Sequence, residues 1–134
     1  MITLLIDVGN TRLKWGLAGP DGAHRVRALA YRENLDAVLA QLLESMPSAP
    51  GRIRACSVTR AEVVAKIDQI ALQAWGLKPE WAEVRAQSGG VTNAYKQVHR
   101  LGVDRWLAIL AAYKLARAAA VVVDVGTAAT IDAV

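Results

Sequence analysis

The chain has 134 residues, a formal net charge of +4 and a hydrophobic fraction of 54%, the composition of an ordinary globular domain with no sign of disorder. Its single cysteine, Cys56, excludes an intramolecular disulfide. No apolar run reaches the roughly 18 residues of a membrane span, and the N-terminus lacks a signal-peptide pattern, so we expect a cytoplasmic protein without a membrane partner. The basic residues are scattered, which argues against a nucleic-acid partner and leaves a small anionic substrate open.

The first 31 residues predict three strands joined by tight turns. The strands are expected at residues 2–8, 12–18 and 23–31. Gly9-Asn10 and Gly19-Pro20-Asp21-Gly22 supply the turn signals, and Val26 and Leu29 are apolar residues of the third strand. The predicted arrangement is an antiparallel meander.

Helices and strands alternate through the rest of the chain. Asn34 is expected to cap a helix over residues 35–46, and Thr59 a second helix that extends to Trp75 and ends at Gly76. The remaining elements are expected as a strand at 52–58, a brief strand at 81–85, a flexible loop from 88, a helix at 103–118 and a strand at 120–125. The last strand is nearly all valine, which predicts burial on both faces. This order predicts a mixed α/β sheet with helices on its faces.

A short motif near the N-terminus is repeated near the C-terminus. LLIDVGNT, from residue 4, aligns without a gap with VVVDVGTA, from residue 121, so that Asp7 meets Asp124. The match continues beyond the turn, where Leu13 meets Thr130. Each copy reads as a strand, an Asp-x-Gly turn with a small polar residue, and a second strand. The repeat predicts one domain over residues 1–118 and the start of a second, similar domain at residues 119–134.

An Asp-x-Gly hairpin has a physical use at a phosphate site. Glycine lets the backbone approach a phosphate without a Cβ in the way, and backbone N–H groups and a threonine hydroxyl can donate to its oxygens. The aspartate would hold a cation that neutralises the phosphates. A single Asp-x-Gly is often a plain turn, whereas two copies in matching strand contexts favour a function.

The combined motifs resemble those of the type III pantothenate kinases, within the superfamily of acetate and sugar kinases, Hsp70 and actin. The segments that carry the resemblance are DVGNTRLKWGL at 7–17, NAYKQVHRLGVDRW at 93–106 and VVDVGTAATID at 122–132. The resemblance implies a ribonuclease H-like (actin-like ATPase) domain with a mixed five-stranded sheet and flanking helices. The sequence departs from the family at Val98, where a proline is usual, so the loop around it is expected to be looser.

The resemblance also implies a function. Type III pantothenate kinases phosphorylate pantothenate to 4′-phosphopantothenate with ATP, which is the first step of coenzyme A biosynthesis. They use Mg²⁺ and a monovalent cation, K⁺ or NH₄⁺, and act as homodimers in which the partner subunit completes the pantothenate pocket. The second domain supplies much of the adenine site in this family, so whether the 134 residues are active by themselves stays open.

Residue roles follow from the same resemblance. Asp104 is the expected catalytic base. Pantothenate binding is expected at Tyr95, Gly102, Val103, Asp104 and Arg105. Binding of the ATP phosphates is expected at Asp7, Val8, Gly9, Asn10, Thr11, Lys14, Gly126 and Thr127. Asp124 would hold the monovalent cation, and Asp7 is a candidate for Mg²⁺.

Plainer interpretations of three of these residues stay open. Asp104 could simply complement the dipole of the helix that it begins. Lys14 could be a solvated strand residue, and Tyr95 an exposed loop aromatic.

Two other functions stay open for the whole chain. One is a non-catalytic regulatory or interaction protein on the same fold, and the other is a kinase of the same superfamily that acts on acetate or a sugar. A P-loop kinase is not supported, because the G-x-x-x-x-G-K-[ST] motif is missing. No His/Cys grouping indicates a zinc site.

Overall fold

The computed structural model describes residues 1–134 except for the side chains of residues 25 and 26, so the expected apolar role of Val26 lies outside the described part. The chain divides into two compact units, Met1–Ala82 and Glu83–Val134. Among the described residues, no helix combines the length and the apolar character that crossing a membrane requires.

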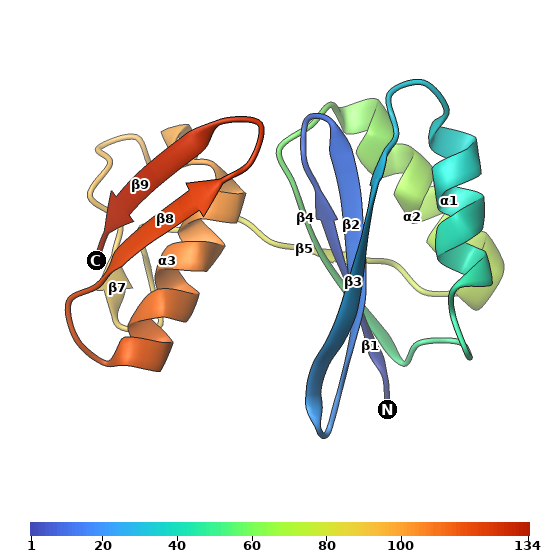
Figure 1. Ribbon diagram of the computed structural model, residues 1–134, viewed down its shortest axis with the longest axis horizontal. Helices are drawn as coiled ribbons and strands as arrows, with labels where there is room; N and C mark the ends of the chain where they lie inside the picture. The colour runs from blue at the N-terminus through green and yellow to red at the C-terminus, as the bar shows by residue number, and fades with distance from the viewer. The chain divides into compact units, whose positions relative to one another are not determined.

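The unit of residues 1–82 is built on the predicted mixed five-stranded sheet (Figure 1). Its strands are β1 (Thr3–Val8), β2 (Arg12–Gly19), β3 (Gly22–Ala30), β4 (Arg52–Ser57) and β5 (Glu80–Trp81). The order across the sheet is β3-β2-β1-β4-β5, with β1, β2 and β3 antiparallel and β4 and β5 parallel to β1. The prediction of a mixed α/β sheet is confirmed, and the brief fifth strand is shorter than expected.

Helices α1 (Leu35–Glu44) and α2 (Ala61–Trp75) both cover the same face of this sheet (Figure 1). Alternation along β1 directs Leu4, Ile6 and Val8 into the core that the helices close, because successive strand side chains point to opposite faces. Within residues 1–82 the helices therefore occupy one face of the sheet rather than both.

The ends of α1 and α2 agree with two of the three predicted cap and stop residues. Asn34 caps α1 as expected, with its side chain accepting a backbone N–H of the first turn at 3.0 Å. Gly76 ends α2 as expected, with a φ of 67° that favours glycine. Thr59 is not the cap of α2, since Arg60 holds that position and makes no side-chain cap bond. The Thr59 hydroxyl is instead hydrogen-bonded to that of Tyr31, at 2.9 Å.

The unit of residues 83–134 contains two hairpins and one long helix. Its elements are β6 (Gln87–Ser88), β7 (Val91–Thr92), the 3₁₀ turn η1 (Val98–Arg100), α3 (Val103–Ala116), β8 (Val121–Val125) and β9 (Ala129–Ala133). A small separate core forms around Trp106, which packs with Val91, Leu101 and Ile109. Val98, around which a looser loop is expected, begins this 3₁₀ turn.

A tight hairpin stands where the sequence predicts a flexible loop from residue 88. Gly89 and Gly90 join β6 to β7 with φ values of 57° and 84°. A two-residue hairpin turn of this kind needs positive φ at both central positions, which glycine adopts at little cost. A Cβ on Gly90 would also come within 3.3 Å of the Tyr113 ring. The Gly-Gly pair is therefore a turn.

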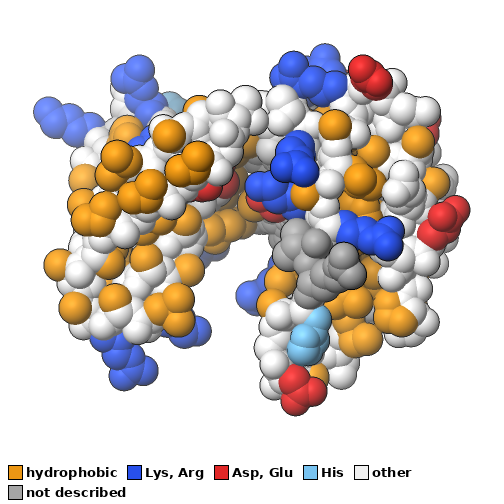
Figure 2. All heavy atoms as spheres, in the orientation of Figure 1, with side chains coloured by type: hydrophobic (Ala, Val, Ile, Leu, Met, Phe, Trp, Pro, Cys, Tyr) orange, Lys and Arg blue, Asp and Glu red, His pale blue; other side chains and the backbone are white. Residues whose placement is uncertain are grey.

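Strand β8 is not buried on both faces, contrary to the expectation from its valines. Val121, Val123 and Val125 are between 61% and 78% exposed. Among the described residues β8 pairs with β9 alone, and α3 packs against the hairpin, so one face of the hairpin is covered and the other is exposed. Figure 2 shows the resulting gathering of hydrophobic side chains over this hairpin.

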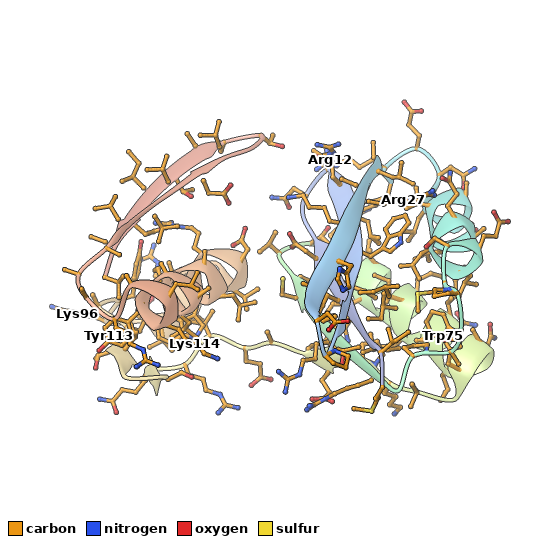
Figure 3. All side chains as sticks on the ribbon, turned by 60° about the horizontal axis from the view of Figure 1, so that its bottom comes forward. Arg12, Arg27, Trp75, Lys96, Tyr113 and Lys114 are labelled. Atoms are coloured by element: carbon orange, nitrogen blue, oxygen red, sulfur yellow. The ribbon has the colours of Figure 1, made fainter. Side chains whose placement is uncertain are left out.

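The basic residues are spread over different elements, as their scatter in the sequence suggests. Figure 3 marks Arg12 on β2 and Arg27 on β3 in the first unit, and Lys96 and Lys114, on a loop and on α3, in the second.

Replacing Leu39 by alanine is expected to lower the free energy of unfolding by about 2–5 kcal/mol, because this α1 side chain is 1% exposed in the core. Leu72→Ala on α2 is the matched control. Its side chain is 50% exposed, and the same substitution should cost roughly 0.5 kcal/mol. Urea-induced unfolding measures both, and equal losses would contradict the position of Leu39 in the core.

Candidate functional site

The residues of the first motif that we expect to bind phosphate lie together at the carboxyl end of β1. β1 and β4 run parallel, so their carboxyl ends lie side by side, and the backbone N–H of Val58 donates to the Val8 carbonyl at 3.0 Å. The turn between β1 and β2 is closed by the Gly9 N–H, which donates to the Arg12 carbonyl at 2.9 Å. Val8 is buried and anchors the turn, whereas Asn10 is exposed at its tip.

Residues from outside the motif hold this turn in place. The Tyr31 hydroxyl donates to the Gly9 carbonyl at 2.6 Å, and the Arg32 Nε donates to the Asn10 carbonyl at 2.7 Å. Tyr31, Arg32 and Asn10 also line a hollow of about 640 Å³ at this end of the sheet, together with Thr59 and other residues. Sequence reasoning missed Tyr31 and Arg32, because only the pairing of β3 beside β2 brings them to the turn.

Asp7 lies on the sheet face opposite the helices, between residues of two neighbouring strands. Its carboxylate is 3.7 Å from the Nζ of Lys14, its cross-strand partner on β2. On the other side the Cys56 thiol of β4 donates to it at 3.4 Å. Lys14 is thus paired with Asp7 rather than free, and its expected contact with phosphate stays a prediction. The pair is partly exposed and contributes little to stability.

The donor set for metal ions is sparse. Among the described residues, no three His, Cys, Asp or Glu side chains group as a metal cage. Mg²⁺ is usually held by one or two carboxylates together with substrate phosphates and waters. A single carboxylate such as Asp7 fits that mode, in which the phosphates supply the rest of the coordination shell. For a monovalent cation, the exposed Asp124 likewise supplies one carboxylate.

The hairpin of β8 and β9 repeats the hairpin of β1 and β2, but its turn is one residue shorter. Asp7 pairs across the strands with Lys14, so a gapless repeat would pair Asp124 with Ile131. The structure pairs Asp124 with Thr130 instead. The gapless alignment therefore holds up to the turn and is wrong beyond it. Because strand side chains alternate, this one-residue shift moves every β9 side chain to the other face.

The start of α3 gathers the residues expected to bind and activate the substrate. Gly102 precedes the helix and Val103 is its first, buried residue. The Asp104 carboxylate accepts the backbone N–H of Arg105 at 2.8 Å. A Cβ on Gly102 would lie 2.7 Å from the Asp104 Oδ1, so glycine leaves the space that this carboxylate occupies. The placement suits both a base and a partner of the helix dipole.

Arg105 is fixed by an acid that sequence reasoning did not identify. Its Nε and Nη2 donate to the two carboxylate oxygens of Asp132, on β9, at 3.0 and 2.5 Å. The hydrogen bonds with Asp132 raise the pKa of Arg105 above its usual value, against the lowering by burial, and Tyr95 adds to the rise. Asp132 stands at the end of the motif VVDVGTAATID, and nothing in that motif predicts its pairing with α3.

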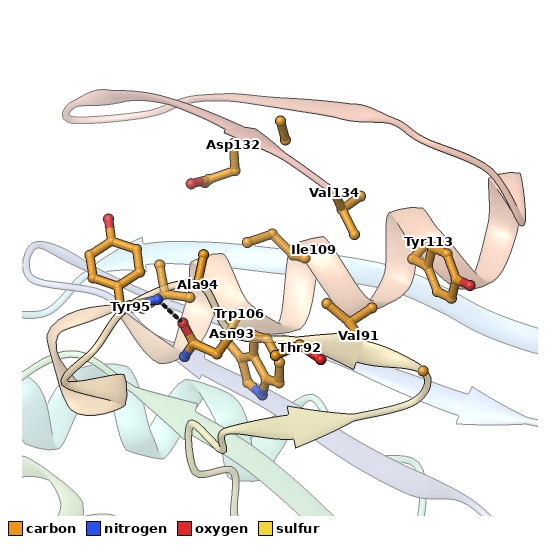
Figure 4. Close-up of a pocket in the computed structure, with 13 residues that line it drawn as sticks. Val91, Thr92, Asn93, Ala94, Tyr95, Trp106, Ile109, Tyr113, Asp132 and Val134 are labelled. Carbon is orange, nitrogen blue, oxygen red and sulfur yellow. Dashed lines mark hydrogen bonds between the residues drawn. The ribbon is translucent and has the colours of Figure 1, made fainter.

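A pocket of about 340 Å³ lies within the unit of residues 83–134 (Figure 4). Trp106 and Ile109 supply apolar lining from α3, whereas Tyr95 and Asp132 contribute polar groups. The Asn93 Oδ1 accepts the backbone N–H of Tyr95 at 2.9 Å and so orders the loop. Tyr95 is 41% exposed. It is an exposed loop aromatic, as one interpretation expected, and it also faces a pocket.

The predicted site residues thus fall into three groups, each within one unit. The structure brings residues 7–11 and Lys14 together in the first unit, and Tyr95 and residues 102–105 in the second. Gly126 and Thr127 lie in the exposed turn between β8 and β9, where the Gly126 N–H donates to the Ala128 carbonyl at 3.1 Å.

Tyr31→Phe is expected to lower the free energy of unfolding by about 1 kcal/mol and to speed hydrogen exchange at the Gly9 amide, because the buried hydroxyl that holds the turn is lost. Tyr113→Phe is the control, since the described residues supply no hydrogen-bond partner for its hydroxyl. Urea unfolding and amide exchange measure the two effects. Unchanged exchange at Gly9 would show that Tyr31 does not hold the turn.

Comparison with known proteins covers nearly the whole chain. Curated relatives named type III pantothenate kinase are 39% identical over 131 residues in Aromatoleum aromaticum, 39% over 134 in Halorhodospira halophila and 37% over 144 in Verminephrobacter eiseniae. These alignments cover 96%, 96% and 100% of this chain but 52%, 53% and 55% of the relatives, so the chain spans about half their length. A solved exopolyphosphatase-like protein is similar over 61% of this chain and 32% of its own, at 17% identity and a TM-score of 0.36, too low to carry a conclusion. Because the family model described as type III pantothenate kinase matches residues 3–134, the chain belongs to the type III pantothenate kinase family.

Proposed function

We propose that the protein carrying this chain transfers the γ-phosphoryl group of ATP to the primary hydroxyl of pantothenate, the first step of coenzyme A biosynthesis. The observation that supports this most is the arrangement at the start of α3. Asp104 and an Arg105 held by Asp132 occupy the first turn of the helix, and the residues on either side of that turn, Leu101 and Trp106, line a pocket.

In this proposal Asp104 acts as the general base. Its carboxylate takes the proton of the acceptor hydroxyl as the new O–P bond forms, and the bond between the γ-phosphorus and the β–γ bridging oxygen breaks to release ADP. Arg105 binds the pantothenate carboxylate through N–H donors that Asp132 leaves free. Tyr95 lines the pocket, and Gly102 and Val103, at the start of α3, are further proposed contacts of pantothenate.

The phosphates of ATP would bind at the two Asp-x-Gly turns. Backbone N–H groups around Gly9 and Gly126, with the side chains of Asn10, Thr11 and Thr127, are the proposed donors. Mg²⁺, when bound, neutralises phosphate charge, and Asp7 is the carboxylate that would hold it. Asp124 would hold the monovalent cation, K⁺ or NH₄⁺. Lys14 would have to leave Asp7 to reach a phosphate.

The architecture of the whole protein is part of the proposal. Residues 119–134 would begin a second domain of the same plan as residues 1–118, and that domain would complete the adenine site. A homodimer would complete the pantothenate pocket, and the cytoplasm is the proposed location. The second domain is supported by the repeated hairpin motif and by the chain's spanning about half the length of its relatives. The homodimer and the location are proposed from the resemblance to the family alone.

Asp104→Asn is expected to lower kcat for pantothenate by about 10²–10⁴-fold, because the amide cannot take the hydroxyl proton. The assay measures ADP release by the complete protein that contains this chain, with Mg²⁺ and with K⁺ or NH₄⁺. Asp21→Asn, the same change at an exposed turn residue, is the control. Acetate and hexoses replace pantothenate in parallel reactions. ADP release with one of them and none with pantothenate would refute the proposed substrate.

Gly102→Ala is expected to lower kcat as well, because the added Cβ would lie 2.7 Å from the Asp104 Oδ1 and displace the carboxylate. Gly19→Ala is the matched control, since nothing lies within 4 Å of the Cβ position there. The same ADP-release assay compares the two. An unchanged kcat in Gly102→Ala would mean that the position of this carboxylate does not matter to the reaction.

A further inference from the structure

We propose that Asp132 is a positioning residue for substrate binding: it holds the Arg105 guanidinium in the orientation that receives the carboxylate of the substrate. The inference rests on the proposed function, since it assumes that Arg105 binds that carboxylate. It concerns a residue outside the set that the sequence motifs single out as site residues.

The contact has the geometry of an orienting pair. Both carboxylate oxygens of Asp132 accept from one edge of the Arg105 guanidinium, the Nε–Nη2 edge. Such two-pronged pairing fixes the plane and the direction of the group, which a single hydrogen bond does not. A guanidinium has five N–H donors, and Asp132 uses two of them. Three donors therefore remain, on Nη1 and Nη2, for Tyr95 and an anionic ligand.

The pair is placed beside the pocket rather than on an open surface. The Asp132 side chain is 10% exposed and that of Arg105 is 29% exposed. Asp132 lines the pocket together with Tyr95, which also interacts with Arg105. Figure 4 shows the Asp132 carboxylate and the Tyr95 hydroxyl at the same side of this pocket. The Arg105 guanidinium is thus held next to two residues that line the pocket, in a direction that Asp132 sets.

The pairing register of the β8–β9 hairpin places Asp132 on the side of the hairpin that faces Arg105. Asp132 pairs with Val122, and both are partly buried, whereas Val123 and Ile131 on the other face are exposed. Asp132 consequently points to the face of the hairpin that packs on α3, where Arg105 begins the helix.

A tie between α3 and β9 could also be only structural, so the test has to separate the two roles. A positioning residue acts through Arg105 alone. Its removal should raise the KM for pantothenate, leave kcat and the KM for ATP little changed, and have no further effect once Arg105 is gone. A structural residue would lower stability and activity in either background, since it does not need the guanidinium.

The experiment is a double-mutant cycle in the complete protein that contains this chain. Steady-state ADP release gives kcat and KM for wild type, Asp132→Asn, Arg105→Ala and the double variant. Glu83→Gln, the same carboxylate-to-amide change at an exposed position of the same unit, is the control. Asp132→Asn is expected to raise the KM for pantothenate about tenfold, because charge-assisted hydrogen bonds to Arg105 are lost. The Arg105→Ala protein and the double variant are expected to share one KM.

Two results would overturn the inference: an unchanged KM for pantothenate in Asp132→Asn, or an equal rise in KM with and without Arg105. If Asp132→Asn does not fold, Asp132→Glu takes its place, because it keeps the charge and changes the reach of the carboxylate; the same two results then decide. Wild type that releases no ADP with pantothenate refutes the proposed function and this inference together. Active wild type with an unchanged Asp132→Asn refutes this inference alone.

Discussion

The structure of the first unit depends on the position of β1 at the centre of its sheet. β1 is hydrogen-bonded to β2 on one side and to β4 on the other, so neither edge is exposed. Its alternation sends Leu4, Ile6 and Val8 into the core under the helices and leaves Asp7 on the opposite face. The parallel pairing with β4 then brings the following turn beside the residues that begin α2. The buried strand β1 therefore fixes the position of the polar turn that follows it.

The Asp-x-Gly motif occurs in two different structural surroundings in this chain. In the first hairpin a buried strand, a tyrosine and an arginine hold the turn from outside the motif. In the second hairpin the strand is largely exposed and the turn is one residue shorter. A short Asp-x-Gly sequence therefore specifies a turn and its donors, whereas the surrounding elements decide how firmly the turn is held and which face its strands present.

Side-chain contacts between distant positions organise the second unit. Its core is small and centres on Trp106, and the outer valines of β8 are uncovered among the described residues. The pair of Arg105 with Asp132 joins the helix start to the hairpin at its mostly buried side. The same pair fixes the direction of the Arg105 guanidinium at the start of α3.

The sequence by itself determined the three helices and the order of the main strands, because strand alternation, helical periodicity, the Asn34 cap and the Gly76 stop are local properties of the chain. It did not predict the β6–β7 hairpin, where a flexible loop was expected. It also pointed to the turns and to the start of α3 as the candidate site. Only the tertiary structure decided the register of β9, the exposure of β8, the support of the first turn by Tyr31 and the pairing of Arg105 with Asp132. The contacts of Tyr31 and Arg105 join residues 22 and 27 positions apart, the exposure of β8 depends on which layers cover it, and the register of β9 depends on the length of the turn before it. No local pattern encodes the contacts of Tyr31 and Arg105, since they arise when distant segments pack together.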